Sequence, residues 1–466
     1  MVKTEYRGNP GFGQRDSVEH DGYDKALNTD GRETIEQDGA DLLEKILDRD
    51  NLNRAYKQVK SNNGAPGIDG MSVEDALPWL QENRKELLEI IRQGKYKPQP
   101  VRRKEIPKPD GGVRKLGIPT VIDRVIQQAI AQKLQPIYEP LFSEGSYGYR
   151  PGRSAQQAMM KAKAYAEEGY VYVVQVDLSK YFDTLNHDLL MNLLRRQIED
   201  KRVIELIKKY LKSGVMENGI VCKTEEGSPQ GGPLSPLLAN IYLNEFDHEM
   251  ESRGVKLLRY ADDVIVFAKS QRAAERLLGS SQKYLEEILK LKMNMDKSTA
   301  TSVFSSRFKF LGFTLGKNGQ GIYIRAHKKS LKKAKQKLKE KTKRSQSKTV
   351  RAVMKDVEKY IRGWIGYYYI ASIKRVLENW SEWLRRRFRM YIWKQWKVPK
   401  ARVKALIQLR IPRDKAYEWG NSRRGYWRIA GSPILSTAIN NERLAQAGYY
   451  NFPEQYESLR KVHLCG

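Results

Sequence analysis

The positive charge of this 466-residue chain is concentrated in one segment. Residues 321–430 hold 33 Lys and Arg against 7 Asp and Glu, a net charge of +26, whereas the whole chain carries +30. The other residues are therefore close to neutral as a group. The same segment holds seven of the eight tryptophans, which a solvated basic tail would lack. We expect a near-neutral body joined to a folded basic part that binds a polyanion such as nucleic acid.

Composition excludes several classes of protein. With 40% hydrophobic and 10% aromatic residues, the chain can build about two to four packed units. It contains no run of eighteen apolar residues and starts without an apolar stretch, so we expect neither a membrane span nor a secretory signal. Its two cysteines, Cys222 and Cys465, cannot form a disulfide framework or a four-cysteine zinc module. This composition favours a reducing compartment.

The first two thirds of the chain alternate between helix-like and strand-like patterns. Residues 1–38 are polar and acidic, and we expect them to be disordered. The β-rich run 170–176 ends at Asp177, and residues 255–268 contain two apolar runs separated by acids, which is typical of a hairpin. Further patterns predict helices over 72–94, over 121–141 and from Ser235-Pro236, and a hairpin over 101–119.

The basic segment is expected to be helical. A Lys-rich helix is predicted from His327 to about Arg344. Residues 350–369 and 376–396 each place apolar side chains on one helical stripe, which predicts the core of a small bundle. Outside these stripes lie four arginines that could contact nucleic acid, namely Arg385, Arg386, Arg387 and Arg389.

Three acids carry the chemistry that the sequence suggests. Asp177 ends a predicted strand, and Asp262 and Asp263 lie at the tip of a predicted hairpin, so one sheet could bring them together. Crowded carboxylates repel one another unless a divalent cation neutralises them, and oxygen ligands favour Mg²⁺ or Mn²⁺. Two such ions can support phosphoryl transfer. An isolated Asp-Asp pair is usually only a solvated turn, so its surroundings decide.

Those surroundings resemble reverse transcriptases. Tyr260-Ala261-Asp262-Asp263, with residues 177–183 upstream, resembles the polymerase palm of these enzymes. Residues 227–240, GSPQGGPLSPLLAN, resemble the nucleotide- and template-contacting motif of group II intron reverse transcriptases and their bacterial relatives. The order and spacing of the three motifs also match.

The resemblance extends outward in both directions. Residues 63–70 are similar to the extra N-terminal motif of non-retroviral reverse transcriptases, and residues 106–119 to their fingers hairpin. Residues 146–154 and 310–313 also fit, and Ile361-Arg362-Gly363-Trp364 resembles the maturase-specific thumb. From residue 39 to about 460, the chain resembles a bacterial, group IIC-like group II intron-encoded reverse transcriptase/maturase that lacks the endonuclease domain.

This resemblance implies an α+β fold. Expected are the fingers and palm of a right-hand polymerase, with an antiparallel palm sheet, an α-helical thumb or maturase domain, and a small basic C-terminal domain. The implied boundaries are 1–38 for the N-terminal extension, 39–325 for fingers and palm, 326–399 for the thumb, and 400–466 for a DNA-binding region.

The resemblance also implies metal ligands. Asp177 and Asp262, with the backbone carbonyl of Leu178, would hold two Mg²⁺ ions, for which Mn²⁺ can substitute, and Asp263 would support them. Five residues would contact the nucleotide: Lys108, Arg114, Phe182, Gln230 and Lys297. Simpler interpretations stay open: Lys108 and Arg114 could flank an ordinary hairpin, Phe182 could be core, and Lys297 a surface ion-pair partner.

The implied function is RNA-directed DNA synthesis together with binding of the group II intron RNA to assist splicing and mobility. Expected partners are the intron RNA, an RNA template with DNA primer, target DNA and deoxynucleoside triphosphates, with no membrane. The expected location is the bacterial cytoplasm, as a ribonucleoprotein with intron RNA. Besides the four arginines above, the nucleic-acid contacts would be Lys332, Lys333, Lys335, Lys337, Arg362, Arg423 and Arg424.

Two other functions stay open at this point. One is a reverse transcriptase of another bacterial class, namely a retron, diversity-generating or CRISPR-associated enzyme. The other is a non-catalytic RNA-binding splicing factor, which the intact acids Asp177, Asp262 and Asp263 disfavour. The last hundred residues hold one His and one Cys, so we expect no zinc-supported endonuclease.

Overall fold

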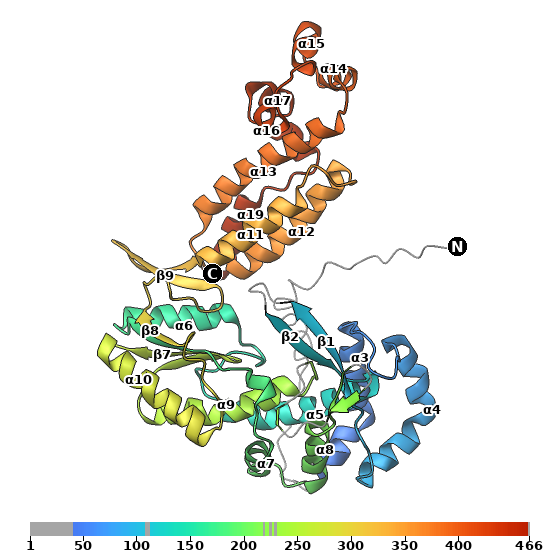
Figure 1. Cartoon of the computed structure of the whole chain (residues 1–466), viewed down its shortest axis with the longest axis vertical. Coiled ribbons are helices and arrows are strands. Elements are labelled where there is room, and N and C mark those ends of the chain that lie inside the picture. Colours follow the sequence, from blue (N-terminus) through green and yellow to red (C-terminus); the bar gives the residue numbers. More distant parts are fainter. Residues whose placement is uncertain (1–40, 108–111, 218–219, 223–225, 228–230, 465–466) are drawn as a thin grey trace. The chain divides into compact units, whose positions relative to one another are not determined.

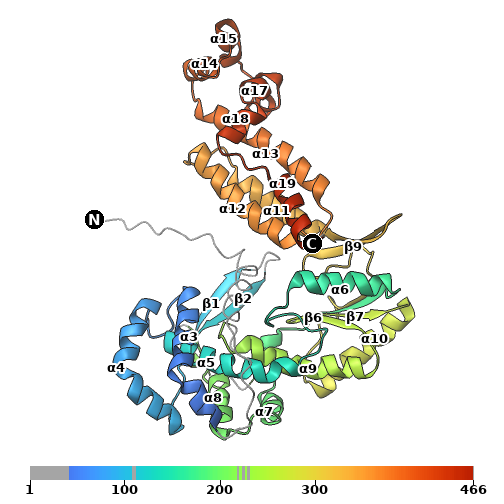
Figure 2. The ribbon, with the colours of Figure 1, turned by 180° about the vertical axis from the view of Figure 1, so that it is seen from behind.

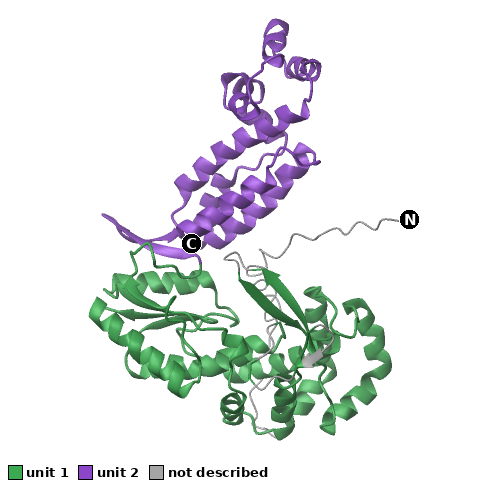
Figure 3. Cartoon of the chain, in the orientation of Figure 1, with its two compact units in different colours: residues 1–311 green, residues 312–466 purple. Residues whose placement is uncertain are grey.

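A computed structural model describes residues 41–464 except 108–111, 218–219, 223–225 and 228–230. The predicted disordered extension 1–38 lies outside the described residues. The chain forms two compact units, residues 1–311 (unit 1) and 312–466 (unit 2), shown in Figure 3. Within the described ranges, no helix combines the length and apolar character needed to cross a membrane.

Unit 1 contains the four-stranded antiparallel sheet that holds the acids. Its strand order is β6-β7-β3-β8. In this sheet Val176 pairs with Val264 and Tyr260 with Asp263, so the end of β3 lies beside the β6–β7 turn. The strands are β3 (Tyr172–Val176), β6 (Leu257–Tyr260), β7 (Asp263–Ala268) and β8 (Thr299–Ser302). The predicted hairpin with acids at its tip is confirmed.

Helices cover both faces of this sheet. Helix α6 (Ala155–Glu167) lies on one side, and α9 (Ser235–Ser252) and α10 (Gln271–Lys283) lie on the other (Figures 1 and 2). Helix α9 starts with Ser235 and Pro236. Backbone N–H groups in the first turn of a helix have no partner within the helix, so the missing N–H of proline removes no helical hydrogen bond there. The α+β architecture of the prediction is confirmed.

A second sheet in unit 1 has the order β2-β1-β4-β5. Its β1–β2 pair is the predicted hairpin, with Pro107 opposite Val113, and most of the tip lies outside the described residues. The sequence did not predict that β4 pairs in parallel with β1. The strands are β1 (Val101–Pro107), β2 (Val113–Ile118), β4 (Val215–Glu217) and β5 (Ile220–Cys222).

Helix α5 (Val121–Tyr138) forms the centre of the rest of unit 1 and is almost wholly buried along its first three turns. Thr120 caps it by accepting a hydrogen bond from the Asp123 N–H, and a reciprocal capping box of Ser72 and Asp75 starts α4. Around them lie α2 (Leu42–Leu47), α3 (Arg49–Ser61), α4 (Val73–Arg92), α7 (His187–Arg195) and α8 (Lys201–Leu211). Short helical turns are η2 (Glu139–Leu141), η3 (Tyr181–Asp183) and η4 (Tyr284–Ile288).

Unit 2 opens with a hairpin and continues as helices. Strands β9 (Phe313–Asn318) and β10 (Gly321–Ala326) precede α11 (Lys328–Lys341), α12 (Val350–Tyr368) and α13 (Lys374–Gln395). The two predicted apolar stripes form core, with only Trp364 of their ten side chains partly exposed. The stripe residues are Val353, Val357, Ile361, Trp364 and Tyr368 on α12, and Leu377, Trp380, Leu384, Phe388 and Tyr391 on α13. Six shorter elements follow: α14 (Pro399–Gln408), α15 (Arg413–Gly420), α16 (Tyr426–Ala430), α17 (Pro433–Ala438), α18 (Asn441–Gln446) and α19 (Phe452–Leu464).

The last helix, α19, departs from the predicted domain boundaries. It packs back against α12 and α13, with Phe452 and Tyr456 buried (Figure 1). The Tyr456 hydroxyl donates to the Ala371 carbonyl at 2.7 Å and accepts from the Ile373 N–H at 3.3 Å. The end of the predicted 400–466 region therefore completes the helical bundle. The predicted boundary after residue 325 also differs, because the β9–β10 hairpin belongs to unit 2, which starts at Gly312.

We predict that Phe452→Ala destabilises unit 2 by about 3–5 kcal/mol, because it removes a buried aromatic ring and leaves a cavity. Seven of the eight tryptophans lie in unit 2, so denaturant unfolding followed by tryptophan fluorescence reports on this unit. Val462→Ala on the same helix is the matched control, because Val462 is 67% exposed. Equal stability of the two variants would contradict the integration of α19 into the bundle.

Candidate active site

The β6-β7-β3-β8 sheet brings the three predicted acids to one end. Asp177 follows β3, Asp262 lies in the β6–β7 turn, and Asp263 is the first residue of β7. Asp262 and Asp263 both keep exposed surface. Loss of water around its carboxyl nevertheless raises the pKa of Asp262. The charge of Arg114 lowers this pKa, and the charge of Asp177 raises it. The pKa of Asp263 rises to about 6, through loss of water and then repulsion from Asp262. The three carboxylates are therefore electrostatic neighbours.

The donor set suits a hard divalent cation. Carboxylate oxygens are the ligands that Mg²⁺ and Mn²⁺ prefer, and their mutual repulsion is relieved by positive charge. Among the described residues, no three acid, His or Cys side chains already converge closely enough to enclose an ion. The carboxylates are thus adjacent without forming a complete coordination shell, and an ion would have to draw them together.

Asp177 is held by the segment that carries Lys297. The Asp177 N–H donates to Ser298 Oγ at 3.0 Å, and the Asp177 carbonyl accepts from the Asn294 N–H at 2.8 Å. Lys297 Nζ lies 4.0 Å from Asp177 Oδ2. Leu178, whose carbonyl is the third predicted metal ligand, pairs with Met293 in an isolated antiparallel bridge. Lys297 thus lies beside the acids, and sequence reasoning missed Ser298 as the residue that fixes Asp177.

The segment after Asp177 leads to Phe182, one of the predicted nucleotide contacts. Phe182 is half-buried, and its ring centroid lies 5.3 Å from that of Tyr181. The buried Tyr181 hydroxyl donates to the Ala239 carbonyl of α9 at 2.6 Å. His187 Nε2 donates to the Gly227 carbonyl at 2.6 Å, which ties this segment to the start of the 227–240 motif. Sequence reasoning missed Tyr181 and His187, although both lie close to the motif acids in sequence.

The other predicted nucleotide contacts are only partly described. Arg114 is exposed on β2, and its charge acts on Asp262, so the hairpin β1–β2 lies within electrostatic reach of the acids. Lys108 and Gln230 lie outside the described residues. The structure therefore brings together Asp177, Asp262, Asp263, Arg114 and Lys297.

Unit 2 displays exposed cations on α11. Lys332, Lys333, Lys335 and Lys337 are all exposed. Lys335 Nζ lies 5.5 Å from the centroid of the Trp383 ring. On α12, Arg362 pairs with Glu358 at 2.8 Å and stacks 4.0 Å over the Tyr450 ring. Arg423 and Arg424 are exposed between α15 and α16.

The four arginines of α13 are more internal than predicted. Arg387 is buried and donates to Thr342 Oγ1 and to the carbonyls of Lys339 at 2.9 Å and Thr342 at 3.0 Å. Its predicted contact with nucleic acid is therefore wrong, because its donors are used to hold the C-terminal end of α11. Arg389 donates to the Ile439 carbonyl at 2.8 Å and to Asn441.

The other two arginines of α13 make internal contacts with part of their guanidinium groups. Arg386 lies 4.1 Å over the Trp427 ring and donates to the Trp427 carbonyl at 2.9 Å. Arg385 donates to Ser381 Oγ at 3.1 Å. Both keep some exposed surface, so a contact with nucleic acid stays a prediction for them.

Known proteins match both units. Residues 106–315 match the reverse transcriptase (RNA-dependent DNA polymerase) family, and residues 331–408 match the group II intron, maturase-specific domain. Protein YkfC of Escherichia coli (strain K12) is 35% identical over 314 residues, which cover 59% of this chain and 82% of YkfC. The group II intron-encoded protein LtrA of Lactococcus lactis subsp. cremoris is 39% identical over 222 residues, 47% of this chain and 37% of LtrA. A chain of a partial Cas6-RT-Cas1–Cas2 complex shares 27% identity over 53% of this chain and 43% of its own length, with a TM-score of 0.35.

The fold, the acids and the domain matches define a protein of the reverse transcriptase class. The chain belongs to the family of group II intron-encoded reverse transcriptases and maturases. The family predicted from the motifs is therefore confirmed.

We predict that Asp263→Asn stabilises the metal-free protein at pH 7.5. The folded-state pKa of Asp263, about 6, exceeds the ordinary 3.8, so the folded state keeps a proton that the unfolded state loses between these values. Stability from this group is therefore lost as pH rises through that window. With EDTA present, the melting temperature of the variant should exceed that of the wild type by on the order of 2 °C at pH 7.5.

The difference in melting temperature should shrink towards pH 4.5, where the wild-type carboxyl is largely protonated. Glu199→Gln, which neutralises an exposed acid elsewhere in unit 1, is the control and should show no such pH-dependent gain. A melting temperature of Asp263→Asn below that of the wild type at pH 7.5 would contradict the electrostatic description of the site.

Proposed function

We propose that this protein copies group II intron RNA into DNA during intron mobility and binds the same RNA through unit 2 to assist its splicing. The observation that carries the proposal is the cluster of Asp177, Asp262 and Asp263 at one end of a polymerase palm sheet, in a chain whose other unit holds most of the positive charge. Its partners are the intron RNA, an RNA template annealed to a DNA primer, target DNA and deoxynucleoside triphosphates. The place of action is the bacterial cytoplasm, as a ribonucleoprotein.

In this proposal Asp177, Asp262 and the Leu178 carbonyl hold two Mg²⁺ ions, and Asp263 supports them. Bound ions of this kind stabilise the attacking and leaving oxygens of phosphoryl transfer. Loss of water, and then repulsion from a neighbouring acid, raises the pKa values of Asp262 and Asp263. These raised values support the assignment, because a bound cation would stabilise the charged carboxylates.

Other side chains handle the nucleotide. Arg114, together with Lys108, binds the triphosphate, for which a guanidinium is well suited. Lys297 lies beside Asp177 and can give a proton to the leaving pyrophosphate. Phe182 excludes a ribose 2′-hydroxyl by its bulk, and Gln230 contacts the new base pair.

Unit 2 would bind RNA through its exposed lysine and arginine side chains. The lysines of α11 project into solvent, and Arg362 and Arg386 cover aromatic rings while keeping exposed surface. Such charges attract phosphates irrespective of sequence, and folded RNA shape supplies the selectivity. Arg423 and Arg424 are the candidates for contact with target DNA.

The test of the polymerase assignment is Asp262→Asn. Loss of one carboxylate should lower Mg²⁺-dependent primer extension by more than about 100-fold, because the remaining ligands hold the ions poorly. Binding of intron RNA and the melting temperature should stay close to those of the wild type. The matched control is Glu199→Gln, and substantial extension by purified Asp262→Asn would end the metal-ligand assignment.

The RNA-binding assignment has a separate test. Replacing Lys332, Lys333, Lys335 and Lys337 with Ala should weaken binding of structured RNA and flatten its salt dependence. The log–log slope should fall by up to about 0.9 for each duplex phosphate that the variant no longer neutralises. A variant that removes four exposed lysines of unit 1, Lys57, Lys60, Lys85 and Lys95, controls for net charge. An unchanged slope in the α11 variant would show that this helix does not touch RNA.

A further inference from the structure

The turn that carries Asp262 is in an unfavourable backbone conformation. It has two central residues, because β6 ends at Tyr260 and β7 begins at its partner Asp263. Ala261, the first central residue, has a φ of 58°, whereas Asp262 has no positive φ. This sign pattern is that of a type II′ turn, whose first position favours glycine. An alanine there costs on the order of 1 kcal/mol or more, so the surroundings must impose the conformation.

One neighbour of the turn is the segment 145–148. The Arg259 N–H donates to the Gly145 carbonyl at 2.8 Å, and the Tyr147 N–H donates to the Arg259 carbonyl at 2.8 Å. A Cβ atom on Gly148 would lie 2.3 Å from the Ala261 nitrogen, which is too close for any side chain. The backbone of this segment therefore packs directly against the turn.

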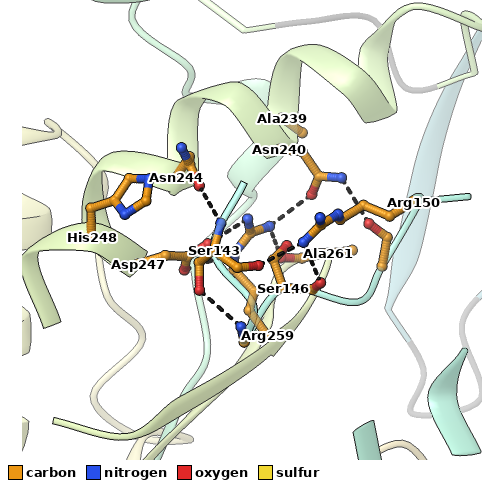
Figure 4. Close-up of polar contacts among 12 residues, drawn as sticks. Ser143, Ser146, Arg150, Ala239, Asn240, Asn244, Asp247, His248, Arg259 and Ala261 are labelled. Atoms are coloured by element: carbon orange, nitrogen blue, oxygen red, sulfur yellow. Dashed lines mark hydrogen bonds and ion pairs between the residues drawn. The ribbon is translucent and has the colours of Figure 1, made fainter. Parts of the chain in front are cut away.

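The other support is a polar network beneath the turn, shown in Figure 4. The Arg259 guanidinium forms an ion pair with Asp247, with Nη2 2.6 Å from Oδ2. Its Nη1 donates to Asn240 Oδ1 at 2.7 Å and to the Ala261 carbonyl at 3.3 Å. The side chains of Arg259 and Asp247 are fully buried, and so is Asn240.

Helix α9 joins the two supports. Asn240 also donates from Nδ2 to the Gly148 carbonyl at 2.7 Å, so one amide contacts both Arg259 and the segment beside the turn. Asn240 and Asp247 are seven residues apart, which places them on one face of α9 two turns from each other. The same helix accepts the Tyr181 hydrogen bond at Ala239, next to the segment that follows Asp177.

This network is a poor source of net stability. Removing a guanidinium and a carboxylate from water costs several kcal/mol, and replacing a buried pair by apolar residues of similar size is often neutral. A geometric role explains its presence better, because the guanidinium of Arg259 contacts Asp247, Asn240 and the Ala261 carbonyl at once.

We propose that Arg259, Asp247 and Asn240 are positioning residues that fix the β6–β7 turn so that Asp262 and Asp263 face Asp177 in the arrangement a divalent cation needs. The inference rests on the proposed function, in which these acids hold Mg²⁺. Groups that orient metal ligands commonly alter metal affinity or activity by about 10–100-fold when they are removed.

The test is the double variant Asp247→Leu with Arg259→Met, which replaces the ion pair by apolar side chains. Its melting temperature without metal and its affinity for an annealed primer–template should stay near the wild-type values. The Mg²⁺ concentration that half-saturates primer extension should rise by about 10–100-fold. Binding of Mn²⁺ followed by electron paramagnetic resonance, with primer–template but without nucleotide, should weaken to a similar degree.

A control separates this effect from a general loss of polar contacts. Tyr96→Phe removes the hydrogen bond from the Tyr96 hydroxyl to Asp123 of α5, at 2.7 Å, and should leave both metal measurements unchanged. Wild-type metal affinity in a folded double variant would overturn the inference. An equal loss in Tyr96→Phe would overturn it too, because the effect would not be specific to the turn.

Arg259→Lys keeps the buried positive charge but loses the planar guanidinium with its several N–H donors. It is the variant to test if the double variant does not fold. It should show the same weakened metal response, and loss of folding in both variants would make the network structural and overturn the positioning role. The proposed function is judged separately on the wild type. If wild-type Mn²⁺ binding is absent, or is unaffected by Asp262→Asn, the metal assignment itself fails.

Discussion

The crowding of three carboxylates at one end of the palm sheet is the constraint on which this part of unit 1 depends. The register of β3, β6 and β7 places Asp177, Asp262 and Asp263 side by side. Loss of water, and then repulsion between the acids, raises the pKa values of Asp262 and Asp263, so holding these two carboxylates there costs free energy. Such an arrangement persists only where the backbone cannot relax away from it. The strained Ala261 and the residues that hold it follow from this requirement, and Lys297 partly offsets the charge of Asp177.

The lysines of α11 and the clustered arginines of α13 differ in role. The α13 arginines supply internal contacts: Arg387 caps the end of α11, and Arg386 stacks on Trp427. Lysine supplies solvent-exposed charge along α11. This division fits the planar, multiply donating guanidinium and the compact, strongly hydrated ammonium group. A net charge counted from sequence therefore overstates the surface that is free to meet phosphates.

The sequence predicted the palm hairpin because its two apolar runs and the acids between them are local features. It also predicted the stripes of α12 and α13, whose period is helical. It did not predict the return of α19 to the bundle, because Tyr456 of this helix finds its partner Ala371 85 residues away in the sequence. The sequence did not predict the burial of Arg387 for a similar reason. Its partners are backbone carbonyls at the end of another helix, and backbone carbonyls leave no pattern in the sequence. Arg259, inside a short β run, showed no sign of its contacts with α9.

The central claim is that DNA synthesis and RNA binding use different parts of this chain. The most direct test is the double change Asp262→Asn and Asp263→Asn, assayed for splicing of the cognate intron RNA at near-physiological salt and for primer extension on an unrelated template. The acids contribute no attraction to RNA, so the variant should lose DNA synthesis and still promote splicing at the wild-type level. Loss of splicing together with DNA synthesis, in a variant that remains folded, would contradict the division of labour between the two units.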